Sequence, residues 1–301
     1  MKIYSPAKIN LRLEVLKKRK DGYHEIRGIF QKINLADKIE ISLTRGEGIS
    51  LSCSDPELPQ GEENLAFKAA RLILSRTGRK AGVRITIEKN IPLAAGLGGG
   101  SSNAASVLIA LNQMMKLRLP SELMMDTGKS LGADVPFFLF RKKTAFVTGI
   151  GEKLEAMVIR PRLYLVLVNP GIPISTAFAY QRLNRELTNR ANNIITIPTE
   201  IEELTGLLPL LSNDFEEVIF PLYPEIKEIK ERLVTEGAEG SLMSGSGSTV
   251  FGIFGNRKEA LRAYQRLQSA THWKVFFTWS SYLRKKEHAD GDHRGKGIPD
   301  K

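Results

Sequence analysis

The sequence contains a single cysteine, Cys53, among its 301 residues. One thiol excludes an intramolecular disulfide and any metal site built from several cysteines. A run of about 18 apolar residues is also absent, so we expect no membrane-spanning helix. The first residues, Met1–Pro6, enter a structured pattern at once, with no apolar signal region and no Arg/Ser-rich transit segment. These absences predict a cytoplasmic protein.

The composition is that of a soluble globular protein, with 42% hydrophobic and 26% charged residues. The formal net charge of +11 raises the alternative of a nucleic-acid binder. No zinc-finger spacing, helix-turn-helix signal or aromatic RNA-binding motif accompanies this charge, which is spread through the chain. A positive surface also concentrates small anionic ligands. We therefore favour an enzyme that binds a nucleotide, with neither nucleic acid nor membrane as a partner.

A glycine- and serine-rich stretch, Pro92–Ser102, separates a strand pattern from a helix pattern. Residues 83–87 alternate between apolar and polar, which predicts a half-buried strand. From Ala104 onward apolar residues recur at helical spacing, with Ser101 or Ser102 as the expected N-cap. Glycines let the backbone approach a ligand, and the first helical turn leaves N–H groups unpaired beside a positive dipole end. The stretch therefore predicts a phosphate cradle.

Two common phosphate loops do not fit this stretch. A Walker loop ends in Gly-Lys-Ser/Thr, whereas this one ends Gly100-Ser101-Ser102, and a dinucleotide fingerprint starting at Gly96 needs glycine at position 101. For three glycines alone, a simple turn before a capped helix would be the favoured interpretation. The full run of Pro92–Ala105 instead resembles the central signature of the galactokinase–homoserine kinase–mevalonate kinase superfamily of small-molecule kinases.

Three further segments narrow the resemblance: Pro6–Leu11, Asp21–Glu25 and Leu131–Phe137. Together with the glycine stretch they resemble the 4-diphosphocytidyl-2-C-methyl-D-erythritol kinases of non-mevalonate isoprenoid synthesis, over about residues 3–280. The resemblance implies ATP-dependent phosphorylation of the 2-hydroxyl of the methylerythritol unit. The alternatives are another kinase of the superfamily, of the homoserine or mevalonate type, and a non-catalytic binding protein on the same fold.

The same resemblance implies roles for individual residues. Strand alternation places Lys8 and Asn10 on one face. Asp134, which alone would pass for a turn residue, is implied to accept the proton of the acceptor hydroxyl while Lys8 stabilises charge. The implied ATP-binding residues are Asn64, Pro92, Leu93, Ala94, Ala95, Gly96, Leu97, Gly98, Gly99, Gly100, Ser101 and Ser102. The implied substrate-binding residues are Asn10, Tyr23, His24, Thr176 and Tyr180.

Within that substrate site, Tyr23 and Tyr180 are implied to sandwich a cytosine while His24 holds its edge. Taken alone, His24 would be interpreted as a structural histidine. ATP and Mg²⁺ are the implied cofactors. We expect Mg²⁺ to be held mainly by ATP phosphates, with Ser102 as a candidate protein ligand. A monomer and a homodimer both remain open.

The predicted fold is α+β with two domains, a β/α ATP-binding kinase domain at 1–158 and a ferredoxin-like layer at 159–283. Residues 284–301 lack apolar periodicity and are predicted to be disordered. Asn64 and Gly78 are expected to bound one helix, and Ser121 to cap another. Phe137–Phe140 resembles a strand. Further elements are expected at 163–168 (strand), 175–180, 213–220 and 225–236 (helices), 242–251 (strand, loop, strand), 258–267 (helix) and 273–279 (strand).

Overall fold

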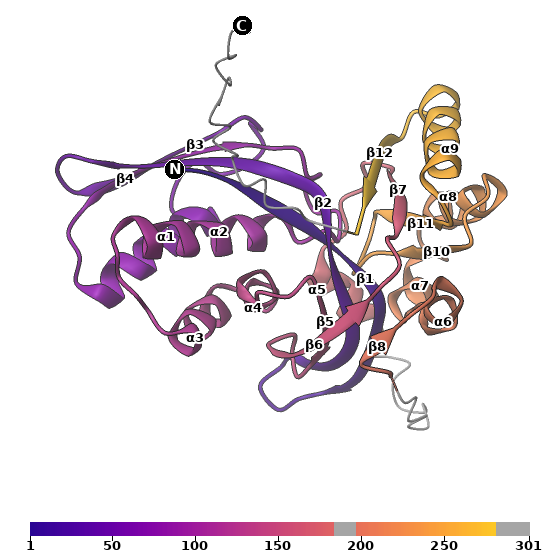
Figure 1. The fold of residues 1–301 in the computed structure, drawn as a ribbon, viewed down its shortest axis with the longest axis horizontal. Coiled ribbons are helices and arrows are strands. Elements are labelled where there is room, and N and C mark those ends of the chain that lie inside the picture. The colour runs from indigo at the N-terminus through magenta and orange to yellow at the C-terminus, as the bar shows by residue number, and fades with distance from the viewer. Residues whose placement is uncertain (184–196, 281–301) are drawn as a thin grey trace, which may run out of the picture.

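The computed structural model describes residues 1–183 and 197–280, and the predicted tail at 284–301 lies outside them. Two layers stand side by side, a long sheet covered by helices and a smaller sheet with its own helices (Figure 1). Within the described ranges, none of the helices combines the length and hydropathy that a bilayer-spanning segment needs.

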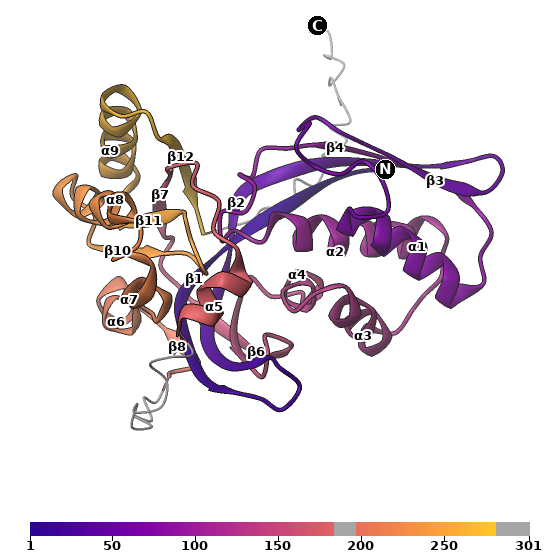
Figure 2. The ribbon, with the colours of Figure 1, turned by 180° about the vertical axis from the view of Figure 1, so that it is seen from behind.

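Two long antiparallel strands, β1 (Lys2–Lys18) and β2 (His24–Thr44), run through the molecule and reach both layers (Figure 2). Their connection contains Gly22, whose φ of 87° is accessible to glycine without strain. The expected alternation is confirmed, because Ala7, Ile9 and Leu11 are fully buried in an apolar cluster. The polar residues between them take the other face of the strand.

The first sheet has the order β3-β4-β2-β5-β6-β8, with β1 beside β2. Helices cover one of its faces (Figure 1), and α2 packs on β1 and β2. The elements of this part are β3 (Gly48–Cys53), α1 (Leu65–Thr77), β4 (Gly82–Glu88), α2 (Gly99–Met114), α3 (Ser121–Leu131), α4 (Val135–Leu139), β5 (Thr144–Thr148) and β6 (Lys153–Ile159).

Three local predictions from the sequence need correction. The N-cap of α2 is Gly98, with φ 70°, and not Ser101 or Ser102, because this helix starts from a left-handed residue that glycine adopts freely. Ser121 is the first residue of α3, and Pro120 occupies the cap position. Phe137–Phe140 lies mostly in the helix α4, because a short apolar run does not distinguish a buried strand from a buried helix.

The second sheet confirms the expected ferredoxin-like layer. Its four antiparallel strands have the order β10-β11-β7-β12, which is the order of a split β-α-β-β-α-β motif. Helices α8 and α9 pack on these strands. The elements are β7 (Tyr164–Asn169), α8 (Pro224–Thr235), β10 (Gly240–Met243), β11 (Val250–Phe254), α9 (Arg257–Ala270) and β12 (Lys274–Trp279).

Two short strands of the later chain return to the first sheet. β8 (Glu200–Ile201) pairs with β6, and β9 (Ser212–Asn213) pairs with β1, both in parallel. Between and around them lie α5 (Thr176–Leu183), α6 (Leu204–Leu207), the 3₁₀ turn η2 (Leu208–Leu210) and α7 (Phe215–Ile219). The two halves of the chain therefore share strands as well as a core, and the predicted boundary at 158/159 stays a prediction.

Candidate active site

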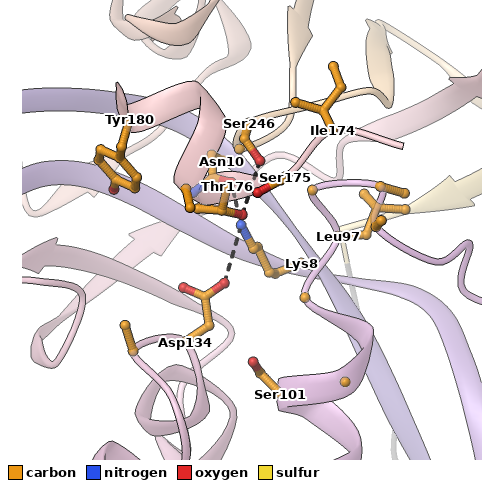
Figure 3. Close-up of a pocket in the computed structure, with 18 of the residues that line it drawn as sticks. Lys8, Asn10, Leu97, Ser101, Asp134, Ile174, Ser175, Thr176, Tyr180 and Ser246 are labelled. Atoms are coloured by element: carbon orange, nitrogen blue, oxygen red, sulfur yellow. Dashed lines mark hydrogen bonds and ion pairs between the residues drawn. The ribbon is translucent and has the colours of Figure 1, made fainter. Parts of the chain in front are cut away.

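A cavity of about 1040 Å³ lies where the two layers meet. Its walls come from β1, the β1–β2 turn, the glycine stretch, the start of α4, α5 and the loop 244–248 (Figure 3). Segments far apart in the sequence thus converge on one space, and they include all the motifs that the sequence analysis singled out.

Lys8 and Asp134 face each other in this cavity (Figure 3). Lys8 Nζ lies 3.7 Å from Asp134 Oδ2 and donates a hydrogen bond to Asn10 Oδ1 at 2.5 Å. Burial lowers the pKa of the Lys8 ammonium, and the Asp134 carboxylate opposes that shift. Asn10 Nδ2 is buried and has no hydrogen-bond partner among the described residues. The group offers one cation, one carboxylate and one free amide donor to a ligand.

The glycine stretch is held against two other segments. Lys8 N donates to Leu97 O at 2.9 Å, and Ser244 Oγ donates to Gly96 O at 3.0 Å. Gly96 has φ 74°, and a β carbon there would lie 1.9 Å from Ser244 O. Only glycine permits this approach. The contacts fix the loop backbone before any ligand arrives.

The N-terminus of α2 opens toward the cavity, which Gly98, Gly99, Gly100 and Ser101 line. No side chain caps this helix end, so its first N–H groups remain available beside the positive end of the helix dipole. Such an end of a sixteen-residue helix suits a phosphate. This geometry is compatible with a phosphate at the start of α2, and the anion site stays a prediction.

A buried carboxylate that the sequence analysis missed anchors this stretch. Asp37, fully buried on β2, accepts hydrogen bonds from Asn90 N at 2.8 Å, Ile91 N at 2.9 Å and Asn103 Nδ2 at 2.9 Å. It also forms an ion pair with Lys89. Asp37 thus connects the residues just before the glycine stretch to α2. The sequence gives no signal of this role, because polar residues such as Lys38 and Glu40 are common along the same strand.

Aromatic rings line the end of the cavity that lies away from the glycine stretch (Figure 3). The rings of His24 and Tyr180 stack with centroids 4.6 Å apart and planes 17° apart. Phe215, which the sequence analysis did not single out, meets Tyr180 edge-on at 4.9 Å. Tyr23 also lines the cavity and is 57% exposed. Burial raises the pKa of the Tyr180 hydroxyl. The structure stacks His24 on one face of Tyr180, and Tyr23 shares only the cavity lining with them.

Thr176 lies at the start of α5 and also lines the cavity. Its Oγ1 is 3.3 Å from Ser246 Oγ in the loop 244–248, and both side chains line the same cavity as Lys8 and Asn10 (Figure 3). Hydroxyl groups both donate and accept hydrogen bonds. Ser246 is therefore a further polar group for a ligand, which the sequence analysis did not single out.

Two predicted residues do not line this cavity. Asn64 caps α1, because its Oδ1 accepts from Ala66 N and its Nδ2 donates to Pro59 O. Ser102 is fully buried, and its Oγ accepts from Ser5 Oγ at 2.8 Å. Ser101, by contrast, points into the cavity (Figure 3). Their predicted roles at ATP and Mg²⁺ remain untested.

Sequence comparisons place the chain among known kinases. Residues 64–142 match the family model "GHMP kinases N terminal domain", and residues 197–272 match "GHMP kinases C terminal". The 4-diphosphocytidyl-2-C-methyl-D-erythritol kinase of Geobacter metallireducens is 49% identical over 271 residues, which cover 90% of this chain and 95% of that protein. The chain belongs to the 4-diphosphocytidyl-2-C-methyl-D-erythritol kinase family. It is thus an ATP-dependent kinase, as the motifs predicted.

Solved structures agree with membership in this kinase family. A crystal structure of a 4-(cytidine 5'-diphospho)-2C-methyl-D-erythritol kinase has a TM-score of 0.78 and 35% identity, and the match covers 94% of this chain and 100% of that one. The mevalonate kinase of Methanococcus jannaschii has a TM-score of 0.70 at 16% identity, with 94% and 98% covered. Because the mevalonate kinase is only 16% identical, its similarity shows the fold alone. Both structures confirm the predicted α+β kinase fold.

Proposed function

We propose that this protein transfers the terminal phosphoryl group of ATP to the 2-hydroxyl of 4-diphosphocytidyl-2-C-methyl-D-erythritol. The observation that carries the proposal is the position of the Lys8–Asp134 pair, which lies in one cavity with the glycine stretch and the aromatic rings. A phosphate donor and a cytidyl acceptor can then meet at this pair.

The ATP phosphates would lie against Gly98–Ser101 at the start of α2. Backbone N–H groups and the helix dipole supply positive potential there without a bound side-chain cap. The adenine would lie toward Leu58, Leu65 and Lys89, which also line the cavity; Leu65 and Lys89 lie next to Gly100 and Gly99. Asn64 fixes the start of α1, so its predicted contribution to ATP binding would come through Leu65.

Mg²⁺, when bound with ATP, would neutralise phosphate charge and orient the transferred group. Among the described residues, no group of three or more His, Cys, Asp or Glu side chains could hold a metal ion. A site in which ATP phosphates supply most ligands fits this donor set, and Ser101 Oγ and the Asp134 carboxylate are the oxygens that line the cavity nearby. Ser102 would require a different side-chain orientation, because its hydroxyl bonds Ser5.

Asp134 would take the proton from the 2-hydroxyl as that oxygen bonds to the terminal phosphorus and the bond to the bridging oxygen of ADP breaks. Lys8 would stabilise the charge that develops on the acceptor oxygen and on the transferred group. Asn10 Nδ2, which lacks a partner among residues 1–183 and 197–280, would donate to the acceptor. Most of the rate enhancement would come from holding the two substrates in line.

The cytosine would bind at Tyr23, His24 and Tyr180. Aromatic rings stack on a pyrimidine, and a histidine ring nitrogen hydrogen-bonds its polar edge. Because His24 covers one face of Tyr180, the base would stack on the other face of Tyr180 or displace the histidine ring. Thr176 and Ser246 would meet the diphosphate or the polyol.

A coupled ADP-release assay tests the proposal directly. The purified protein should release ADP with the cytidyl substrate and not with homoserine or mevalonate at equal concentration. Faster turnover of either of those alcohols would contradict it. The predicted monomer or homodimer, the cytoplasmic location and the lack of a nucleic-acid partner remain proposals. Duplex DNA should bind weakly, with the binding lost between low and moderate salt.

A further inference from the structure

The short helix α4 lies between two buried lysines. Lys8 on β1 and Lys32 on β2 are directly paired in the antiparallel ladder, so both side chains leave the sheet on the same face. Lys8 Nζ lies 3.7 Å from the carboxylate of Asp134, the residue before α4. Lys32 Nζ donates to Phe138 O at 3.3 Å and to Phe140 O at 2.5 Å at the other end. Each lysine therefore holds one end of the helix.

A helix of this length needs such support. α4 has five residues, Val135–Leu139, and its C-terminal carbonyl groups have no partners within the helix. A cation beside those carbonyls also interacts favourably with the negative end of the helix dipole. Lys32 supplies both the hydrogen bonds and the charge, so it fixes where the C-terminus of α4 lies.

Aromatic rings pack between the two lysines. Lys8 Nζ lies 5.1 Å from the Phe30 ring centre, and Lys32 Nζ lies 5.2 Å from that of Phe137. Phe30 and Phe137 themselves meet edge-on at 5.5 Å. Because all four side chains are buried, a shift of α4 would break contacts at both ends together.

Burial of the Lys32 side chain is unfavourable for the stability of the folded chain. Lys32 is 8% exposed and forms no ion pair with a described residue, and burial lowers its pKa to about 8. Burying an unpaired ammonium is unfavourable compared with an apolar side chain of similar size. An apolar side chain would fill this part of the core at a lower cost in free energy than Lys32 does. Its charge is directed at α4, the helix that carries Asp134.

We propose that Lys32 is a positioning residue for phosphoryl transfer, which holds α4 so that the Asp134 carboxylate stays beside Lys8 and the acceptor hydroxyl. The inference rests on the proposed role of Asp134 as proton acceptor. Lys32 itself touches neither substrate, since it does not line the cavity that holds the Lys8–Asp134 pair.

The test compares Lys32→Met and Lys32→Gln with wild type in steady state. A displaced Asp134 should lower kcat by roughly tenfold or more, because misplacement of a catalytic group by about 1 Å can cost 10²-fold. The KM values for ATP and for the cytidyl substrate should stay within about twofold. Lys32→Arg, which keeps a charged donor, should recover part of kcat. Lys38→Met, on the same strand but outside the core, serves as the matched control and should match wild type.

A double-mutant cycle separates positioning from general stability. In an Asp134→Asn background, Lys32→Met should lower kcat by less than about twofold further, because its effect acts through the carboxylate. An equal fold-loss in both backgrounds would overturn the proposal. So would kcat within about twofold of wild type in both single variants, or loss of fold in both, which would assign Lys32 to overall stability. Failure of the wild type to use the cytidyl substrate would instead refute the proposed function.

Discussion

The carbonyl oxygen of Ser244 lies 1.9 Å from the place that a β carbon on Gly96 would occupy. The two residues are 148 positions apart, yet they touch backbone to backbone, and Ser244 Oγ also donates to Gly96 O. This contact connects the glycine stretch to the loop between β10 and β11. The shape of the phosphate cradle therefore depends on the second layer as much as on its own glycines.

Gly96→Ala should consequently be far more costly than an ordinary glycine replacement. The methyl group meets backbone that cannot move aside, and φ 74° adds strain. We expect a loss of about 2 kcal/mol or more in the free energy of unfolding and a raised KM for ATP. Gly78→Ala is the matched control, since its φ is 63° but the space around it is open. It should cost about 1 kcal/mol. Urea denaturation of both variants checks this, and equal losses would contradict it.

Removing either member of the Lys8–Asp134 pair should impair chemistry more than binding. Asp134→Asn and Lys8→Met should each lower kcat by roughly 10²-fold or more, the scale for a positioned proton acceptor or charge stabiliser. ATP binding, measured by calorimetry without turnover, should be largely retained. Asp126→Asn, an exposed aspartate on α3, is the control and should match wild type. Activity within threefold of wild type in both variants would refute the assignment.

The aromatic end of the cavity should determine the acceptor and leave ATP untouched. Tyr180→Ala removes a ring stacked on His24 and should lower kcat/KM for the cytidyl substrate by roughly tenfold or more, equivalent to about 1.4 kcal/mol. Tyr23→Ala and His24→Ala should act in the same direction, while the KM for ATP stays nearly constant. If the KM for ATP changes and kcat/KM for the cytidyl substrate does not, these residues belong to the ATP-binding part of the cavity.

Much of this site could be predicted from local patterns. Alternation along β1 placed Lys8 and Asn10 on one face, and the structure joins them by a hydrogen bond. The strand, glycine and helix signals around Gly96 predicted the cradle. The pairing of Asp134 with Lys8 rested on resemblance and not on pattern, because two residues 126 positions apart leave no local trace.

The parts that could not be predicted depend on tertiary contacts. The sequence of α4 resembles a strand, yet the segment is a helix whose Phe137 packs edge-on against Phe30 of β2. Asp37 and Lys32 are two of many polar residues along β2, and only the folded chain shows which groups they hold. The structural roles of such residues depend on contacts with residues that are distant in sequence.

Asp37 provides a test of how firmly the cradle is anchored. Asp37→Asn removes the charge that faces the buried Lys89 ammonium and replaces one acceptor oxygen with an amide donor that faces other donors. We expect a loss of about 3 kcal/mol or more in unfolding free energy, as for breaking a buried ion pair. Glu88→Gln, which breaks the exposed Lys38 pair, is the control and should cost less than about 1 kcal/mol. Similar small losses for both would contradict the anchoring role.

Lys32 also makes stability depend on pH in a defined direction. Its pKa of about 8 in the folded chain lies below the ordinary 10.5, so between these values the unfolded chain binds more protons than the folded chain. The free energy of unfolding contributed by this group therefore rises with pH in that window. Relative to Lys32→Met, wild type should gain at most about 1.4 kcal/mol per pH unit between about pH 8 and pH 10. Denaturation series at three pH values would show it, and a flat difference would contradict it.

The pairing of β9 with β1 affects how the chain is made. The parallel partner of β1, Ser212–Asn213, is translated some 200 residues after Arg12 and Leu13 of that strand. At about 5–20 residues per second, that strand waits roughly 10–40 s on the ribosome for its neighbour. Its edge stays open to other chains throughout that time. We therefore expect slower translation between these segments to lower the yield of folded protein.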